Sequence, residues 1–127
     1  MQFGESVTFT ASATTLSSST LPTLPARSVV TPGVVSAVNK KFFWNSEFFI
    51  TNDTLIPRPD TELVVENILR LTSQKNKINI LEIGIGSGCI LLSILRERKN
   101  FYGTGIDISK NCINITKINA INLKLTS

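Results

Sequence analysis

The sequence predicts an α/β fold with a parallel sheet, and three observations support this prediction. Residues 78–83 and 101–106 are short, apolar and rich in β-branched or aromatic side chains, and each is followed by apolar residues at helical spacing. A strand–helix–strand–helix order is typical of parallel strands joined by right-handed crossovers. A glycine-rich loop also separates the first strand from its helix, where glycines let the backbone approach a ligand.

Composition divides the chain near residue 37. Residues 1–37 contain no Ile, Asn or Lys, whereas residues 38–127 contain 15 Ile, 11 Asn and 8 Lys. The first part is rich in Ser and Thr and shows no hydrophobic periodicity, so it cannot bury enough apolar surface to offset the entropy of ordering. We therefore expect residues 1–37 to be disordered and residues 38–127 to form the folded part.

The folded part is expected to begin with a β-hairpin over residues 41–56. The aromatic residues at 42–44 and the apolar Phe48, Phe49 and Ile50 flank the polar residues 45–47, which is typical of two strands and a turn. The prolines on either side of Arg58 keep it extended, because a residue before proline avoids the helical region. Asp60 is a good N-cap, and apolar spacing then predicts a helix over residues 60–72.

The remaining residues predict a β-α-β-α unit over residues 78–122. Its elements are a strand at 78–83, the loop Gly84–Gly88, a helix over 89–98, a strand at 101–106 and a helix from Ser109 to Asn122. Asp107 ends the second strand, 23 residues after Gly84.

Composition indicates neither a metal site nor a membrane span. The chain has two cysteines, Cys89 and Cys112, and no histidine, which is typical of reduced thiols in a cytoplasmic protein. The longest apolar run is too short to cross a bilayer. Scattered lysines explain the net charge of +4, so nucleic acid binding is not indicated. No pattern identifies a catalytic residue.

The glycine loop favours S-adenosylmethionine over a dinucleotide. A dinucleotide fingerprint needs its third glycine at residue 89, which is Cys89, whereas the glycines here are at 84, 86 and 88. Asp107 can accept hydrogen bonds from ribose hydroxyls. S-adenosylmethionine has no pyrophosphate to seat, and its amino-acid end needs polar partners. A nicotinamide or flavin nucleotide, or a glycine turn without a ligand, remain alternatives.

Four stretches together resemble one family. They are Phe43-Trp44-Asn45-Ser46-Glu47-Phe48, Leu55-Ile56-Pro57-Arg58-Pro59-Asp60-Thr61-Glu62, Gly86-Ser87-Gly88-Cys89-Ile90 and Gly105-Ile106-Asp107-Ile108-Ser109. Their order and spacing are similar to those of the HemK-type methyltransferases, which methylate the glutamine side-chain amide of peptide chain release factors. The resemblance covers about residues 40 to 122. It implies an incomplete class I, Rossmann-like S-adenosylmethionine-dependent methyltransferase domain.

The resemblance also implies a cofactor site. Gly84, Gly86 and Gly88 would line the methionine end of the cofactor, and Asp107 would hold its ribose. The remaining implied site residues are Arg58, Pro59, Thr61, Glu82, Ile85, Ser87 and Ile108. Two of these depart from the family, which usually has Asp in place of Glu82 and Thr in place of Ile85. The second difference puts an apolar side chain into the loop.

The family's Asn-Pro-Pro-Tyr motif, which grips the target amide, is not found in these residues. The expected function is therefore that of a fragment of a cytoplasmic release factor glutamine methyltransferase, inactive alone, whose partner is a release factor. The alternatives are a non-catalytic module that binds S-adenosylmethionine or a partner, and a fragment of a DNA or RNA amino-methyltransferase. The Ile-Pro-Arg-Pro stretch argues against the last alternative.

Overall fold

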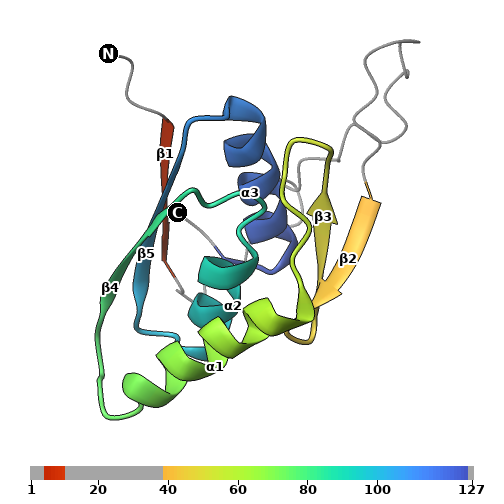
Figure 1. Ribbon diagram of the computed structural model, residues 1–127. Helices are drawn as coiled ribbons and strands as arrows, with labels where there is room; N and C mark the ends of the chain where they lie inside the picture. Colours follow the sequence, from red (N-terminus) through yellow and green to blue (C-terminus); the bar gives the residue numbers. More distant parts are fainter. Residues whose placement is uncertain (1–4, 11–38, 126–127) are drawn as a thin grey trace, which may run out of the picture.

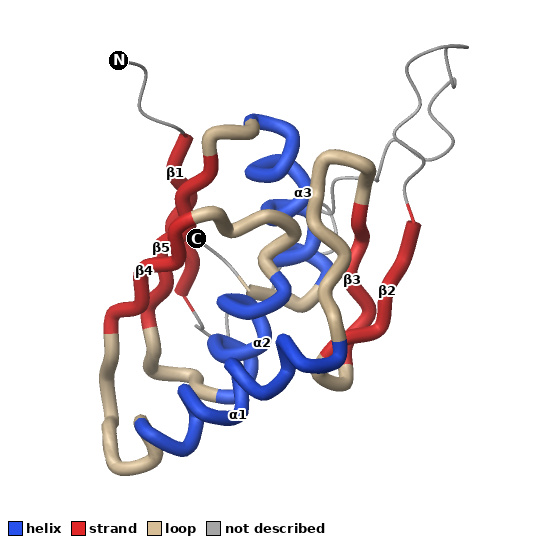
Figure 2. Tube along the Cα trace, viewed as in Figure 1, coloured by secondary structure: helices blue, strands red, loops and turns tan. Residues whose placement is uncertain are grey.

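The structure is a computed structural model that describes residues 5–10 and 39–125 of the chain. Its elements are β1 (Glu5–Thr10), β2 (Asn39–Phe43), β3 (Ser46–Ile50), α1 (Glu62–Leu71), β4 (Asn79–Ile83), α2 (Cys89–Glu97), β5 (Tyr102–Asp107) and α3 (Lys110–Asn122). A short 3-10 turn, Pro59–Thr61, leads into α1. The fold is mixed α/β, as predicted (Figure 1). Figure 2 shows the loop after β4 crossing from the sheet to α2.

The sheet has the order β1-β5-β4. β4 and β5 are parallel, with Asn79 opposite Tyr102 and Ile83 opposite Ile106, and α2 makes the crossover between them. β2 and β3 form a separate antiparallel pair. α3 contacts both β5 and β3, so it lies between the two sheets (Figure 1).

β1 differs from the expectation for the N-terminal segment. Residues 1–37 are expected to be disordered, but Glu5–Thr10 form a strand that pairs antiparallel with β5. Valine, threonine and phenylalanine in this segment suit a strand, and the edge of β5 provides backbone partners that the segment alone does not reveal. The other residues of 1–37 lie outside the described residues.

The hairpin turn lies one residue earlier than the polar residues 45–47 indicate. Trp44 and Asn45 form the two-residue turn, with φ of 45° and 60°, and Ser46 already belongs to β3. Positive φ at both central residues is typical of tight hairpins whose twist matches that of the strands. The hairpin is expected to extend to residue 56, but β3 ends at Ile50, because the backbone turns at residues 51–54, where Thr54 N–H donates to Thr51 O at 3.1 Å.

The core lies between the sheets and the helices. Its fully buried apolar side chains are Phe43, Phe48, Val65, Leu91, Leu92, Ile94, Leu95, Phe101 and Ile113. Exposure alternates along β4: Ile80 is partly buried, whereas Leu81 and Ile83 are 60% and 76% exposed. In the described part of the chain, helices therefore cover one face of the sheet. No helix there is long and apolar enough to span a bilayer.

Candidate functional site

The loop Gly84–Gly88 joins β4 to α2 through three glycines with positive φ. The φ angles are 76° at Gly84, 59° at Gly86 and 84° at Gly88, a region that costs other residues about 1–2 kcal/mol. A Cβ added at Gly84 or Gly86 would meet nothing within 4 Å, whereas one at Gly88 would lie 2.9 Å from Leu92 Cδ1. The first two glycines thus border open space, and the third packs beneath α2.

The end of β5 holds the backbone of this loop. Ile106 O accepts the N–H of Gly84 at 2.8 Å and that of the next residue at 3.0 Å. Asp107 accepts the N–H of Gly86 at Oδ2, at 3.0 Å, and the N–H of Ser109 at Oδ1, at 2.9 Å. A carboxylate has roughly four acceptor positions. Asp107 therefore fixes the loop and still has acceptor capacity for another ligand.

Two side chains of α3 hold the loop from the other direction. Thr116 Oγ1 donates to Gly86 O at 2.8 Å, and Asn119 Nδ2 donates to Ser87 O at 2.8 Å. Neither residue is among those that the sequence predicts for the site. Their partners lie 30 and 32 residues earlier in the chain, so no local pattern could reveal these contacts.

A pocket of about 230 Å³ lies between the glycine loop and the segment before α1. It is lined by Leu55, Ile56, Pro57, Arg58, Thr61, Glu82, Gly84, Ile85, Gly86, Ser87, Cys89 and Ile90. Seven of the eleven expected site residues are in this lining. The other four, Pro59, Gly88, Asp107 and Ile108, lie outside it.

Glu82 is the acidic group of this pocket. Its Oε2 accepts the N–H of Leu91 at 3.1 Å, in the first turn of α2, where the helix dipole favours a negative charge. Burial is the main reason that the pKa of Glu82 is nevertheless raised to about 7; the Leu91 N–H opposes this rise and the nearby Asp107 adds to it. Glu82 is therefore an acid that gains and loses its proton near neutral pH.

Cys89 borders the same pocket as a protonated thiol. Its sulfur lies 2.9 Å from Ser87 Oγ. Burial raises the pKa of this thiol to about 11, so it is not the thiolate that nucleophilic chemistry requires. Among residues 5–10 and 39–125, no group of three or more His, Cys, Asp or Glu side chains could hold a metal ion.

Ile85 is mainly a packing residue of the loop. Its side chain is only 4% exposed, although it also borders the pocket. A Cβ added at Gly105 of β5 would lie 2.0 Å from Ile85 Cδ1. The isoleucine therefore fills the space that the missing side chain of Gly105 leaves, and most of its apolar surface is directed into the core rather than toward a ligand.

Comparison with known proteins identifies the family. No family model matches the chain. Curated release factor glutamine methyltransferases do match: one from Caulobacter vibrioides is 36% identical over 90 residues, which is 71% of this chain and 31% of that protein. One from Shewanella oneidensis is 38% identical over 92 residues, which is 72% of this chain and 32% of that protein. One from Buchnera aphidicola subsp. Baizongia pistaciae is 41% identical over 88 residues, which is 69% of this chain and 32% of that protein. This chain belongs to the release factor glutamine methyltransferase family. It spans about a third of the length of these relatives.

In this family member, two of the stretches that carry the resemblance meet at the base of the hairpin turn. Glu62 accepts the backbone N–H of Trp44 at 2.9 Å, and Trp44 Nε1 donates to Glu97 of α2 at 3.0 Å. Positive φ is unusual for a bulky residue such as Trp44. The hydrogen bonds of its backbone and indole N–H groups help to stabilise this conformation. Arg58 is extended, as expected, with φ −87° and ψ 157°. The hairpin is thus fixed to α1, directly after the segment that lines the pocket.

Proposed function

We propose that this chain is the cofactor-binding part of a release factor glutamine methyltransferase and that its pocket binds S-adenosylmethionine. One observation supports this most: the glycine loop and the segment around Arg58 are separate in sequence, with Arg58 26 positions before Gly84, yet both line the same pocket. The parallel order β4-α2-β5-α3 supports a class I, Rossmann-like domain as the parent fold.

The pocket fits one end of this cofactor. Its volume of about 230 Å³ is below the range of roughly 300–1,000 Å³ that accommodates whole ligands. Glu82 and Arg58 bring a carboxyl group and a guanidinium to its lining, which suits an amino-acid end that carries both charges. Asp107 retains acceptor positions for ribose hydroxyls, and Ile108, 94% exposed beside it, offers apolar surface to adenine.

The proposed reaction of the parent enzyme follows from the family. S-adenosylmethionine supplies the methyl group, and the acceptor is the glutamine side-chain amide of a release factor in the cytoplasm. The role of this chain is to bind the cofactor and hold its amino-acid end. Because its 127 residues contain no Asn-Pro-Pro-Tyr, we expect binding without methyl transfer by this chain alone.

Calorimetric titration of the chain with S-adenosylhomocysteine tests the binding. We expect saturable binding of S-adenosylhomocysteine and no binding of NAD⁺. Gly86→Val, whose side chain would enter the open space at Gly86, should abolish binding, with circular dichroism as the check that the variant folds. Equal affinity for NAD⁺, or no binding of S-adenosylhomocysteine, would contradict the proposal. Radiolabel appearing in a release factor from labelled S-adenosylmethionine would contradict the expected lack of transfer.

A further inference from the structure

Thr116 and Asn119 are two polar side chains of α3 with no exposed surface. They are three positions apart, so they lie on the same face of the helix. Both donate to carbonyls of the glycine loop, Thr116 to Gly86 O and Asn119 to Ser87 O, each at 2.8 Å. A buried hydroxyl and a buried amide are costly unless they are bonded. Here both are bonded, and to neighbouring peptides of the same loop.

The Thr116 contact determines the direction of one backbone donor. In a trans peptide the C=O of one residue and the N–H of the next point in opposite directions, and the described residues contain no cis peptide. Because Gly86 O is directed to Thr116, the N–H of Ser87 is directed away from α3. No described residue accepts that N–H, and Ser87 lines the pocket. The peptide is therefore oriented so that its donor is available to a ligand.

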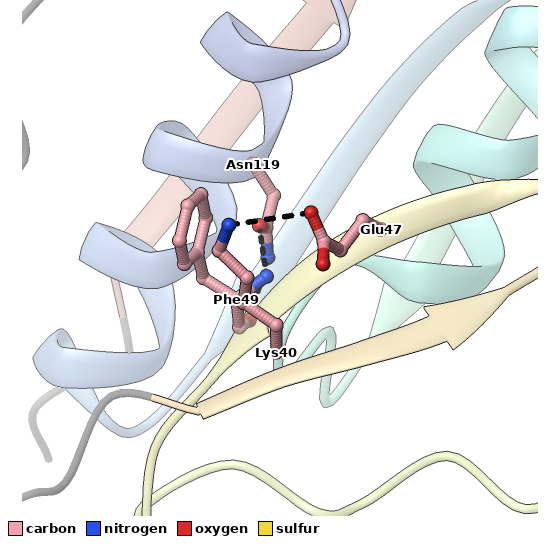
Figure 3. A network of polar contacts seen from close by, with 4 residues as sticks. All are labelled: Lys40, Glu47, Phe49 and Asn119. Atoms are coloured by element: carbon pink, nitrogen blue, oxygen red, sulfur yellow. Dashed lines mark hydrogen bonds and ion pairs between the residues drawn. The ribbon is translucent and has the colours of Figure 1, made fainter.

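Asn119 extends the same arrangement to the hairpin. Its Oδ1 accepts the N–H of Phe49 at 2.7 Å, and its Nδ2 donates to Phe49 O at 2.9 Å (Figure 3). The strand that carries Phe49 is paired to β2, where Lys40 forms an ion pair with Glu47 at 3.3 Å and lies 5.4 Å from the centre of the Phe49 ring. Asn119 thus joins β3 and the loop through one side chain.

We propose that Thr116 and Asn119 are positioning residues of the cofactor site, and that Thr116 orients the Gly86–Ser87 peptide so that the Ser87 N–H receives the amino-acid end of the ligand. This inference rests on the proposed binding of S-adenosylmethionine. It assigns the two residues a role in affinity for one part of the ligand, in addition to their contribution to stability.

The experiment compares two ligands on the 127-residue chain. S-adenosylhomocysteine carries the amino-acid end, whereas 5′-methylthioadenosine keeps the adenosine and thioether and lacks that end. Thr116→Val has nearly the same shape and removes the hydroxyl. We expect this variant to lower the affinity for S-adenosylhomocysteine about tenfold, which is the effect of one hydrogen bond. Its affinity for 5′-methylthioadenosine should be unchanged. Thr116→Ser, which restores the hydroxyl, should recover the affinity.

Thr72→Val is the matched control. Thr72 Oγ1 donates to Ile68 O at 2.7 Å, so this variant loses the same kind of bond at a residue outside the pocket lining, and we expect both affinities to stay as in the wild type. If Thr116→Val lowers the affinity for both ligands equally, or for neither, the positioning role is wrong while the proposed function stands. If the wild type binds neither ligand, both are wrong.

A measurement on the wild type covers the case in which Thr116→Val does not fold. Nuclear magnetic resonance of the labelled chain reports the Ser87 amide proton directly. Addition of S-adenosylhomocysteine should shift this proton and slow its exchange with solvent, and 5′-methylthioadenosine should do neither. An unchanged Ser87 amide at saturating S-adenosylhomocysteine would overturn the inference.

Discussion

The two walls of the pocket are held in place very differently. The glycine-loop wall has its peptide groups bonded on both sides, by the end of β5 and by Thr116 and Asn119 of α3. The opposite wall is largely exposed: Leu55 and Ile56 are 88% and 57% exposed and Arg58 is exposed too, whereas Pro57 is buried. The first wall is therefore part of the core, whereas the second is a segment laid over the surface.

This difference predicts how substitutions act. Changes in the glycine-loop wall should alter the free energy of unfolding, because that wall shares its contacts with β5 and the helices. Changes in the exposed wall should alter ligand affinity and leave stability nearly unchanged. Substitutions at Glu82, Gly105 and Arg58 test this distinction.

Glu82→Gln tests the charge that is buried at the glycine-loop wall. The pKa of Glu82 is about 7 in the folded chain against an ordinary 4.5, so the folded state holds this proton more tightly than the unfolded state. The contribution of Glu82 to the free energy of unfolding is therefore fully present below pH 4.5. As the pH rises through 7 this contribution is lost, and the free energy of unfolding falls by about 3 kcal/mol at most. Glutamine keeps an acceptor for the Leu91 N–H and does not titrate.

Urea unfolding across this pH range measures the effect. The wild type should lose stability relative to Glu82→Gln as the pH rises, and the two should converge at the acidic end, where Glu82 is protonated in both states. The same pH dependence in both proteins would show that Glu82 is better solvated than its environment indicates.

Gly105→Ala tests the packing beneath the same wall. The new Cβ would lie 2.0 Å from Ile85 Cδ1 and 3.0 Å from its Cγ1. Overpacking of this kind costs about 1–3 kcal/mol. Ile85→Val removes Cδ1, so the combined variant should lose less stability than the sum of the two single variants. Simple additivity in urea unfolding would mean that the two side chains do not share this space.

The sequence predicts best the features that a local pattern determines. Glycines at 84, 86 and 88 between a strand and a helix predict a sharp backbone turn, and all three have positive φ; the prolines around Arg58 predict an extended residue, as observed. The α/β class follows from the alternation of strands and helices.

Features that depend on distant partners were not predictable in this way. Asn119 has the pattern of an ordinary helix residue, yet it bonds to Phe49, 70 residues earlier, and to Ser87. β1 pairs with the edge of β5, and the alternation of Val7 and Phe9 with Ser6, Thr8 and Thr10 is too short to predict this strand without knowledge of that edge. The packing role of Ile85 depends on Gly105, because its side chain fills the space above this glycine of β5.

Arg58→Ala tests the exposed wall and has the smallest expected effect on stability. Arg58 is exposed, so the free energy of unfolding should change by less than about 0.5 kcal/mol. Affinity for S-adenosylhomocysteine should nevertheless fall by about tenfold, because a guanidinium bonded to a carboxylate is among the stronger contacts that a pocket of this size can make. Arg70→Ala is the control: this exposed arginine of α1 bonds to Asn67 at 2.9 Å and is not in the pocket lining, so neither quantity should change. A loss of stability as large as that of Gly105→Ala would show that the segment around Arg58 is part of the core, and the contrast between the two walls would then be wrong.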